Sequence, residues 1–315
     1  MILKNKKILI TGGAGFIGSH LSEILVKSNC VTVYDYFSKF YKGKEKNIAK
    51  IKYNPNFKLV KGDIRNFKDI SNAMKNVDIV FHLAAQPGVR YSLLNPAETN
   101  NVNTEGTLNV LEAAKDNKVE RVVNASSSSV YGEEVSLPIK ETETLKPISI
   151  YGASKLACEH YCRIYHDTYG LDVVSLRFFT AYGPRQRPDM AFHRFVRQIH
   201  DNKPITIYGD GTQSRDFTYV SDIVNGVIAS AVADNIDGES FNLGGGKRTV
   251  LNDVLTILKD LLGEYDVVYE SRKKGDVTHT FADITKAKKM LDYDPQINIR
   301  EGLQKFISWY KETNI

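Results

Sequence analysis

A glycine-rich turn near the start of the chain constrains the possible fold more than any other segment. Residues 11–18 read TGGAGFIG and lie between an apolar run at Lys7–Ile10 and a helical pattern at His20–Lys27. Glycines at these spacings allow a tight turn, close approach of a pyrophosphate and close packing of helix on strand. The helix then presents free N–H groups to the phosphates. The residues that we expect to bind a dinucleotide at this turn are Gly12, Gly15, Phe16, Ile17 and Gly18.

Two acidic residues follow the next two apolar runs. Asp35 comes directly after Cys30–Tyr34, about 20 residues beyond the glycines, where a ribose-binding acid is expected. Its carboxylate accepts hydrogen bonds from a ribose 2′-hydroxyl and repels a 2′-phosphate, so the sequence favours NAD over NADP. Lys39, nearby in the sequence, weakens this preference slightly. Asp63 and its neighbour Ile64 follow the third apolar run, and we expect them at the adenine end of NAD.

Short apolar runs alternate with helical patterns through the first half of the chain. The predicted strands are residues 7–10, 30–34, 57–60, 78–83, 121–125 and 172–177, and the predicted helices are 20–27, 105–115 and 154–169. Such alternation predicts an α/β fold with a doubly wound parallel sheet of the Rossmann type. From about Phe179 the alternation gives way to turns rich in glycine and proline, which indicates a second, smaller mixed α/β lobe.

The chain of 315 residues is long enough for two such lobes. We expect a nucleotide-binding lobe made of residues 1–178 with returning segments at about 214–242 and 276–285. We expect a substrate-binding lobe made of about 179–213, 243–275 and 286–315.

The composition argues against several classes of partner. The net charge of +5, from 42 basic and 37 acidic residues, is spread along the chain, whereas a nucleic-acid-binding protein normally clusters its basic residues. No apolar run approaches the roughly 20 residues of a membrane span, so we expect no membrane. The segment ending at Thr11 runs straight into the glycine turn, which predicts a first strand and not a signal peptide.

The three cysteines predict a reducing compartment and no metal site. An odd number at low density is a poor disulfide framework, which favours the cytoplasm. Cys158, Cys162 and His166 share one face of a predicted helix, but a structural zinc site normally needs four ligands. We therefore interpret them as packing residues.

A tyrosine and a lysine with helical spacing are candidates for acid–base chemistry. Tyr151 and Lys155 lie four residues apart, on one face of a helix. A free phenol titrates near pH 10, and a nearby ammonium or the positive nicotinamide of NAD favours its ionised form. Such a pair can exchange a proton with a sugar hydroxyl while NAD exchanges a hydride.

A run of four serines, Ser126–Ser129, ends the fifth predicted strand, at the sheet edge where active sites of open α/β sheets lie. A hydroxyl there could bind a substrate oxygen. The alternative is a polar strand end whose serines make local turn bonds.

Together these motifs resemble the extended short-chain dehydrogenase/reductase family, and within it the nucleotide-sugar epimerases. The similar segments are the glycine turn and residues 81–85, 103–107, 126–132, 151–155, 211–217 and 241–244. The resemblance implies that Ser127 is the catalytic hydroxyl, with Ser128 a less favoured candidate. It also implies that Tyr151 is the base and that Lys155 is its electrostatic partner and holds the nicotinamide ribose. It places Ala84, Ala85 and Asn103 in the NAD site.

Further segments are similar to UDP-glucuronate 4-epimerases. They are residues 85–92, which include Arg90, and residues 177–190. The resemblance implies that Arg215 grips the diphosphate of a UDP-sugar. Arg187 and Thr180 could hold a uronate carboxylate, although the additional arginines could serve the diphosphate instead. The substrate-binding residues implied in this way are Arg90, Ser127, Ser128, Thr180, Arg187 and Arg215.

The serine run also bears on the reaction. Related 4,6-dehydratases carry an acidic residue just after the catalytic hydroxyl, where this chain has Ser128 and Ser129. We therefore expect a 4-epimerase that oxidises carbon 4 to a transient ketone and returns the hydride to the other face. UDP-glucuronate is the favoured substrate. UDP-glucose stays open, as does UDP-N-acetylglucosamine, because Thr280 replaces a bulky tyrosine of some relatives and suggests a roomier pocket.

Several alternatives also stay open. The chain could be a net sugar-nucleotide dehydrogenase that releases NADH, or an NAD-sensing scaffold, although scaffolds usually lose the tyrosine–lysine pair. The roles of Arg272 and Lys273 are not predicted. The resemblance implies a homodimer formed through Glu98–Lys115 and Ser154–Tyr169.

Overall fold

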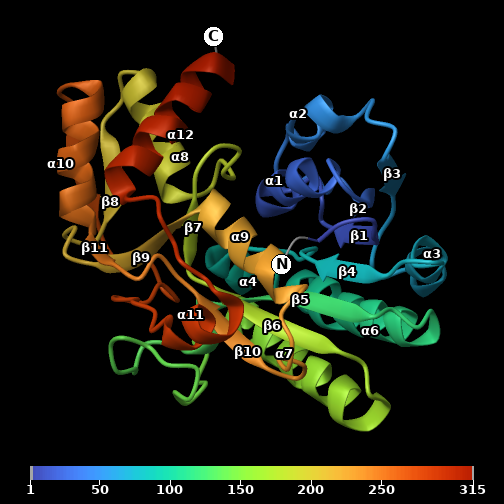
Figure 1. Ribbon diagram of the computed structural model, residues 1–315. Coiled ribbons are helices and arrows are strands. Elements are labelled where there is room, and N and C mark those ends of the chain that lie inside the picture. The colour runs from blue at the N-terminus through green and yellow to red at the C-terminus, as the bar shows by residue number, and fades with distance from the viewer. Residues whose placement is uncertain (1–2, 314–315) are drawn as a thin grey trace.

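A seven-stranded, fully parallel sheet forms the centre of the computed structural model, which describes residues 3–313 (Figure 1). The strand order is β10-β6-β5-β4-β1-β2-β3, and each neighbouring pair is parallel. Its strands are β1 (Lys7–Thr11), β2 (Cys30–Asp35), β3 (Phe57–Lys61), β4 (Ile79–His82), β5 (Arg121–Ser127), β6 (Val173–Phe178) and β10 (Ser240–Leu243). The predicted fold class is confirmed.

Helices cover both faces of this sheet. One face carries α1 (Phe16–Leu25), α9 (Val220–Ser230) and α11 (Thr285–Leu291). The other carries α3 (Phe67–Ala73), α6 (Gly106–Asp116) and the long α7 (Ile150–Tyr169). Short elements connect them: α2 (Lys44–Asn47), α4 (Val89–Leu94), α5 (Pro96–Asn100), a π-helical segment at Asn101–Glu105, and 3₁₀ turns at Ala49–Ile51 and Ser128–Val130. Parallel strands need such crossovers, because their ends lie at opposite edges of the sheet.

Two small sheets and three helices form a smaller group beside the large sheet. The strands are β7 (Thr180–Tyr182), β8 (Ile205–Tyr208), β9 (Ser214–Tyr219), β11 (Arg248–Val250) and β12 (Val267–Glu270). They form a mixed sheet of order β11-β9-β7 and a parallel pair β12-β8. The helices are α8 (Ala191–His200), α10 (Leu251–Leu262) and α12 (Ile299–Thr313). We keep the division into two lobes as a proposal; β10 lies in the large sheet, and β9 pairs with β7 and β11.

All six predicted strands are present, and the differences lie mainly at helix starts. Helix α1 begins at Phe16, directly after the glycine turn, rather than at His20. Helix α7 begins at Ile150 rather than Ser154, because the Ser149 side chain caps it by accepting a hydrogen bond from the Gly152 amide. Strand β10 was not predicted, since four residues give too short a pattern.

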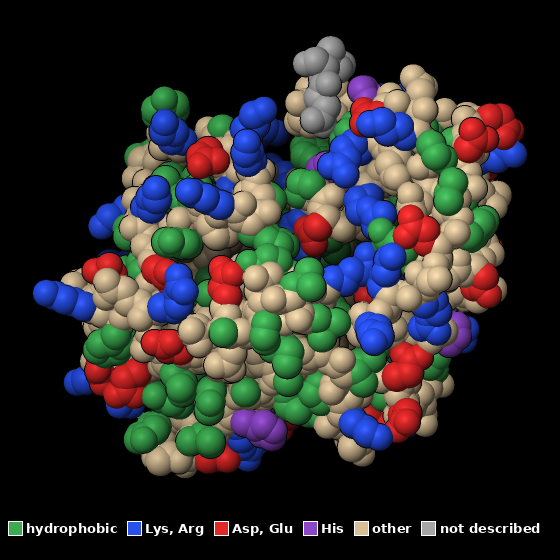
Figure 2. Space-filling model, turned by 180° about the vertical axis from the view of Figure 1, so that it is seen from behind, with side chains coloured by type: hydrophobic (Ala, Val, Ile, Leu, Met, Phe, Trp, Pro, Cys, Tyr) green, Lys and Arg blue, Asp and Glu red, His purple; other side chains and the backbone are tan. Residues whose placement is uncertain are grey.

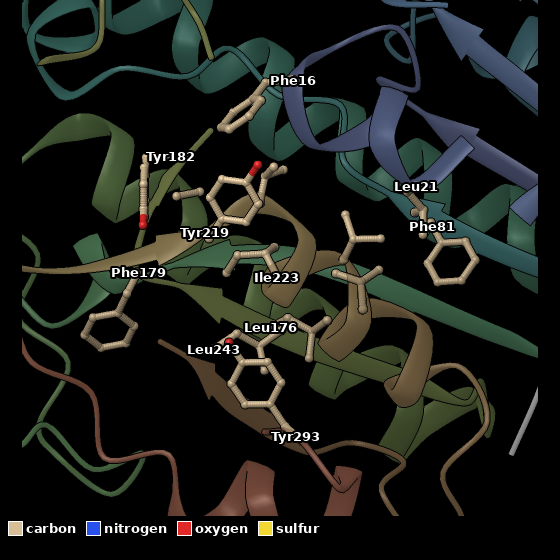
Figure 3. Close-up of a cluster of buried hydrophobic side chains, with 14 of the residues drawn as sticks. Phe16, Leu21, Phe81, Leu176, Phe179, Tyr182, Tyr219, Ile223, Leu243 and Tyr293 are labelled. Carbon is tan, nitrogen blue, oxygen red and sulfur yellow. The ribbon is translucent and has the colours of Figure 1, made fainter. Parts of the chain in front are cut away.

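Most of the buried apolar side chains form one cluster that joins the two groups of elements (Figure 3). Leu176 and Leu243 come from the large sheet, whereas Tyr182 and Tyr219 come from the small one. Phe16, at the start of α1, belongs to the same cluster. This shared core fixes the edge of the large sheet against the smaller group.

The three cysteines are free thiols. Cys158 donates to the Thr107 hydroxyl at 3.2 Å, and burial raises the pKa of both Cys158 and Cys162. No helix within residues 3–313 is long and apolar enough to cross a membrane.

Asp216 in β9 connects three segments of the chain: β9 itself, the loop after β10 and the segment before α11. Its side chain accepts hydrogen bonds from the amides of Gly245, at 2.5 Å, and Ala282, at 3.1 Å. Burial raises the pKa of Asp216 to about 6, and the backbone hydrogen bonds only partly oppose this. The folded protein therefore binds this proton more tightly than the unfolded chain does.

We expect Asp216 to make stability depend on pH. Because its folded pKa lies above the ordinary 3.8, its contribution to the free energy of unfolding falls as pH rises through this interval, by about 3 kcal/mol in total. Urea unfolding of the wild type and of Asp216→Asn, compared across this range, measures the effect. The advantage of the wild type over the variant should shrink as pH rises. An advantage that does not change with pH would contradict the assignment.

Candidate functional site

The carboxyl ends of the central strands open onto a cavity, as expected for a sheet of this type. It is bounded by the glycine turn, the end of β2, the residues after β3 and β4, the end of β5 and one face of α7. Predicted cofactor residues that line it are Gly12, Gly15, Phe16, Ile17, Gly18, Asp35, Asp63, Ile64, Ala84, Ala85, Tyr151 and Lys155.

The glycine turn forms a cradle that side chains would fill. Gly12 has a φ of +69°, and a Cβ on it would lie 2.8 Å from the Ala84 Cα. Helix α1 begins after Gly15 with no side-chain cap, so its first N–H groups face the cavity without a side-chain acceptor of their own. This arrangement fits a pyrophosphate.

Asp35 is the last residue of β2 and is almost fully buried at the edge of the cavity. Its carboxylate accepts hydrogen bonds from the amides of Ala14, at 3.1 Å, and Phe37, at 2.8 Å. The cation that approaches it is Lys44, whose Nζ lies 3.9 Å from Oδ1. Lys39 is exposed, and its effect on the preference for NAD over NADP stays a prediction. Burial lowers the pKa of Lys44, despite the nearby Asp35 carboxylate.

Asp63 lies beyond the end of β3 and is paired with Arg65. The Arg65 Nη2 lies 2.5 Å from Oδ2 of Asp63, and its Nε adds a second contact. Burial raises the pKa of Asp63, but the hydrogen bonds from Arg65 outweigh this and hold it below the ordinary value. Asp63 is thus an ionised acceptor at this end of the cavity.

Asn103 lies behind the wall of the cavity. Its Oδ1 accepts a hydrogen bond from the Gln86 amide at 2.7 Å, and its Nδ2 donates to the Ser154 hydroxyl at 2.9 Å. Asn103 thereby fixes the segment after β4, which carries Ala84 and Ala85, to helix α7. A direct contact between Asn103 and a cofactor stays a prediction.

The predicted catalytic residues converge at the end of β5. Tyr151 and Lys155 project from α7 into the cavity, and the Lys155 Nζ donates to the Ala125 carbonyl at 2.8 Å. Ser127 is the last residue of β5, and its hydroxyl lies 3.1 Å from that of Ser129. Ser128 opens the 3₁₀ turn that follows. The local turn bonds that we considered for the serines therefore exist. Ser126 lines the cavity, whereas Ser127 and Ser128 line neither this cavity nor the one described next, so their contact with a substrate stays a prediction.

A second cavity adjoins the first and lies between α4, α8, β8 and β9. Six cationic and two acidic side chains line it, which favours an anionic ligand. Figure 2 shows Lys and Arg side chains gathered around the hollow between the two halves of the molecule. The charged lining residues are Arg90, Arg187, Arg194, Arg215, Arg272, Lys273, Asp189 and Asp276.

Tyr208 presents an aromatic ring to this cavity, which sequence reasoning missed. Three cationic groups lie against the ring: the Arg90 guanidinium at 4.4 Å, that of Arg194 at 4.9 Å and the Lys273 ammonium at 4.5 Å. A planar ring next to several cations suits a ligand that combines an aromatic base with phosphate. The sequence signal for Tyr208 was weak. The residue precedes the turn at Gly209–Gly211, and its neighbours in the sequence do not distinguish a binding residue from a packing residue.

Arg215 and Thr180 lie in this second cavity as predicted, on neighbouring strands β9 and β7. The Arg215 guanidinium donates to the carbonyl oxygens of Thr278, at 2.9 Å, and Val277, at 2.7 Å, which fixes its direction. Burial lowers the pKa of Arg215. Thr280 is buried and its hydroxyl accepts a hydrogen bond from the Asp216 amide at 3.3 Å. Thr280 lines neither cavity, and the expectation that it leaves a roomier pocket stays a prediction.

Arg187 and Phe40 line both cavities and mark the junction between them. The Arg187 guanidinium binds Asp189 through two nitrogens, Nε at 3.0 Å and Nη2 at 2.9 Å. Burial lowers the pKa of Arg187, but the Asp189 carboxylate outweighs this and raises it. Arg187 is therefore a cation fixed where the two cavities meet.

Fold and cavities together define a Rossmann-type dinucleotide-binding protein with a second site for an anionic, nucleotide-like ligand. A family model described as GDP-mannose 4,6 dehydratase matches residues 9–306, and the chain belongs to that family. It is 42% identical to a UDP-glucuronate 4-epimerase of Thermodesulfobacterium geofontis, over 96% of each chain.

Two solved structures are also similar. One is a UDP-glucuronic acid 4-epimerase from Bacillus cereus in complex with UDP-glucuronic acid and NAD, which is 40% identical with a TM-score of 0.92 and covers 97% of this chain and 99% of that chain. The other is a UDP-N-acetylglucosamine 4-epimerase from Methanobrevibacter ruminantium M1 in complex with UDP-N-acetylmuramic acid. It is 35% identical with a TM-score of 0.92 and covers 98% of this chain and 99% of that chain.

We expect Gly12→Ala to weaken the binding of NAD at least about tenfold, because the new Cβ meets the backbone at Ala84 and pushes the cradle apart. Gly170→Ala is the matched control. Gly170 has a φ of +67°, but a Cβ there meets no atom within 4 Å, so that variant reports the backbone cost alone. Calorimetric titration with NAD measures both. Equal affinity in the two variants would show that the turn does not cradle the dinucleotide.

Proposed function

We propose that this chain is an NAD-dependent UDP-sugar 4-epimerase, with UDP-glucuronate and UDP-galacturonate as its substrate pair. The observation that carries the proposal is that the cavity lined by Tyr151 and Lys155 meets the cationic cavity at Arg187 and Phe40, which line both. The NAD cavity ends at an acid–base pair on α7, and the cationic cavity begins at the adjoining arginine. The similarity to 4-epimerases over nearly the whole chain supports the same assignment.

The residues of the first cavity fit NAD in particular. The uncapped start of α1 and the glycine cradle would hold the pyrophosphate, and Asp35 would accept hydrogen bonds from the adenosine ribose. A 2′-phosphate would face the Asp35 carboxylate at the same place, which favours NAD over NADP. When bound, NAD supplies the acceptor and donor of a hydride at carbon 4 of the sugar.

The chain's own residues would move the proton of the sugar's 4-hydroxyl. Tyr151 accepts it, and the ammonium of Lys155, one helical turn away, stabilises the phenolate that accepts. The Ser127 hydroxyl binds the same sugar oxygen and relays its proton. Tyr151 returns the proton after the sugar has turned over in the site.

The second cavity would bind the UDP part of the substrate. Arg90, Arg194 and Arg215 supply the charge for the diphosphate, and Tyr208 supplies a ring for the uracil. Arg272 and Lys273 line the same cavity, which adds them to the candidates. At the junction, Arg187 and the Thr180 hydroxyl would receive the C6 carboxylate of a uronate, helped by Ser128.

An epimerase fits the end of β5 better than a dehydratase, although the family's name refers to a dehydratase. Elimination of water needs an acid or base beyond the one at carbon 4. The residues that follow Ser127 are Ser128 and Ser129, whose hydroxyls do not serve as such a group near neutral pH.

We further propose a homodimer through α5, α6 and α7. Apolar or aromatic side chains on α7 and on the loop before it are exposed, among them Ile148, Ile164 and Tyr169, and so is Leu94 at the end of the neighbouring α4. Covering such side chains with a second copy would bury apolar area that water contacts in the monomer.

Product analysis tests the proposed function. The purified protein, with no NAD added, is incubated separately with UDP-glucuronate, UDP-glucose and UDP-N-acetylglucosamine, and the sugars are separated by chromatography. We expect conversion to the 4-epimer, fastest for UDP-glucuronate, because the cofactor is regenerated in each turnover. Accumulation of NADH with added NAD would instead make the chain a net dehydrogenase. Tyr151→Phe, which removes the proton acceptor, is the control and should lower kcat by about 10²- to 10⁴-fold.

We expect Arg187→Met to discriminate between uronate and neutral substrates. Loss of a charge-assisted hydrogen bond should lower kcat/KM for UDP-glucuronate about 10- to 100-fold and leave UDP-glucose nearly unchanged. Arg194→Met is the matched variant, since Arg194 lies against Tyr208 and should weaken all UDP-sugars alike. Steady-state kinetics of both variants on both substrates provide the measurement. An equal loss on both substrates for Arg187→Met would assign that residue to the diphosphate.

A further inference from the structure

A buried ion pair lies one helical turn beyond the predicted catalytic residues. Glu159 follows Tyr151 and Lys155 at the same spacing of four residues, so all three share one face of α7. Arg177 in β6 donates to both oxygens of Glu159, from Nε at 3.0 Å and from Nη2 at 2.7 Å. The two side chains are only 7% and 5% exposed.

Glu159 also contacts the end of β5. The Ser126 hydroxyl donates a hydrogen bond to Oε1 of Glu159. The preceding residue, Ala125, accepts the hydrogen bond of Lys155 at 2.8 Å. Two successive turns of α7 therefore hold two successive residues of β5, directly before Ser127.

Arg177 extends these contacts to the far side of the serine turn. Its Nη1 donates to the Tyr131 hydroxyl at 2.8 Å, and Tyr131 donates to Asn242 in β10 at 2.7 Å. Tyr131 closes the turn that starts at Ser128. Ser126, which opens the serine run, and Tyr131, two residues after its end, are thus both bound to one ion pair.

We propose that Glu159, held by Arg177, is a positioning residue that fixes the Ser127 hydroxyl relative to Tyr151 and Lys155. This role rests on the proposed epimerase function, and it falls to a buried pair that lines neither the NAD cavity nor the cationic cavity. Stability alone does not explain the pair, because a buried ion pair is often no more stabilising than apolar residues of the same volume. Apolar side chains could not replace the hydrogen bonds that the ion pair makes with Ser126 and Tyr131.

The test therefore replaces both partners, with the full-length protein carrying Glu159→Met and Arg177→Met. Removing both charges avoids an unpaired buried ion, so the melting temperature should stay close to that of the wild type. With the serine run released, kcat should fall about 10²-fold, while KM for the UDP-sugar and the amount of bound NAD stay close to wild type. The split between kcat and KM separates positioning from a general loss of structure.

The matched control is the ion pair at the other end of the same strands. Arg121, which opens β5, binds Asp172, just before β6, at 2.8 Å. Arg121→Met with Asp172→Met should leave kcat unchanged. If the Glu159/Arg177 variant has a wild-type kcat, positioning is wrong while the epimerase function stands. If the wild-type protein epimerises no UDP-sugar, the proposed function is wrong, and so is the positioning role.

If the double variant fails to fold, Ser126→Ala provides the test of the positioning role. It deletes the single hydroxyl that joins β5 to Glu159 and leaves the ion pair in place. We expect a fall in kcat of about tenfold with KM close to wild type, as for one lost hydrogen bond that orients a reacting group. An unchanged kcat in this variant overturns the proposal.

Discussion

Close packing of α7 against the end of β5 is the constraint on which the candidate site depends. The connection between them runs from residue 131 to 149, far too long to set the position of the helix by itself. Contacts have to do so. Gly152 allows the first turn of α7 to approach the Ser129 carbonyl, where any Cβ would overlap. The hydrogen bond from Lys155 to Ala125 then fixes the helix along its axis.

Features encoded over a few neighbouring residues could be predicted from the sequence. The glycine turn and Asp35 lie where expected, because a strand, a turn and a helix in succession leave little freedom to the chain. The pair Tyr151 and Lys155 reaches the cavity for the same reason, since a spacing of four on a helix fixes a common face. The alternation of strands and helices likewise determined the central sheet.

Features that depend on distant segments could not be predicted. Lys39 is closer to Asp35 in sequence than Lys44, but the short helix α2 brings Lys44 back over the carboxylate. Tyr208 is a candidate ligand-binding residue only because cations on α4, α8 and the loop after β12 lie against its ring. The Thr280 hydroxyl accepts a hydrogen bond from the Asp216 amide, which is 64 residues away in the sequence. In each case tertiary packing, which no local pattern records, decided the outcome.

The junction between the cavities has a charge balance that bears on the substrate. Asp189 occupies the Nε and Nη2 side of the Arg187 guanidinium, so the arginine is already paired before any sugar carboxylate arrives. The Asp189 side chain is 44% exposed and that of Arg187 only 19%. Asp189 could therefore leave the pair, because water would solvate its carboxylate, whereas the more buried Arg187 would stay in place. Binding a uronate would then exchange one carboxylate for another on an arginine that is already oriented, while a neutral sugar would leave the pair intact. The pair would thus accommodate both substrate classes, and preference for the uronate would come from the hydrogen bonds of its carboxylate with Arg187 together with contacts to groups such as Thr180.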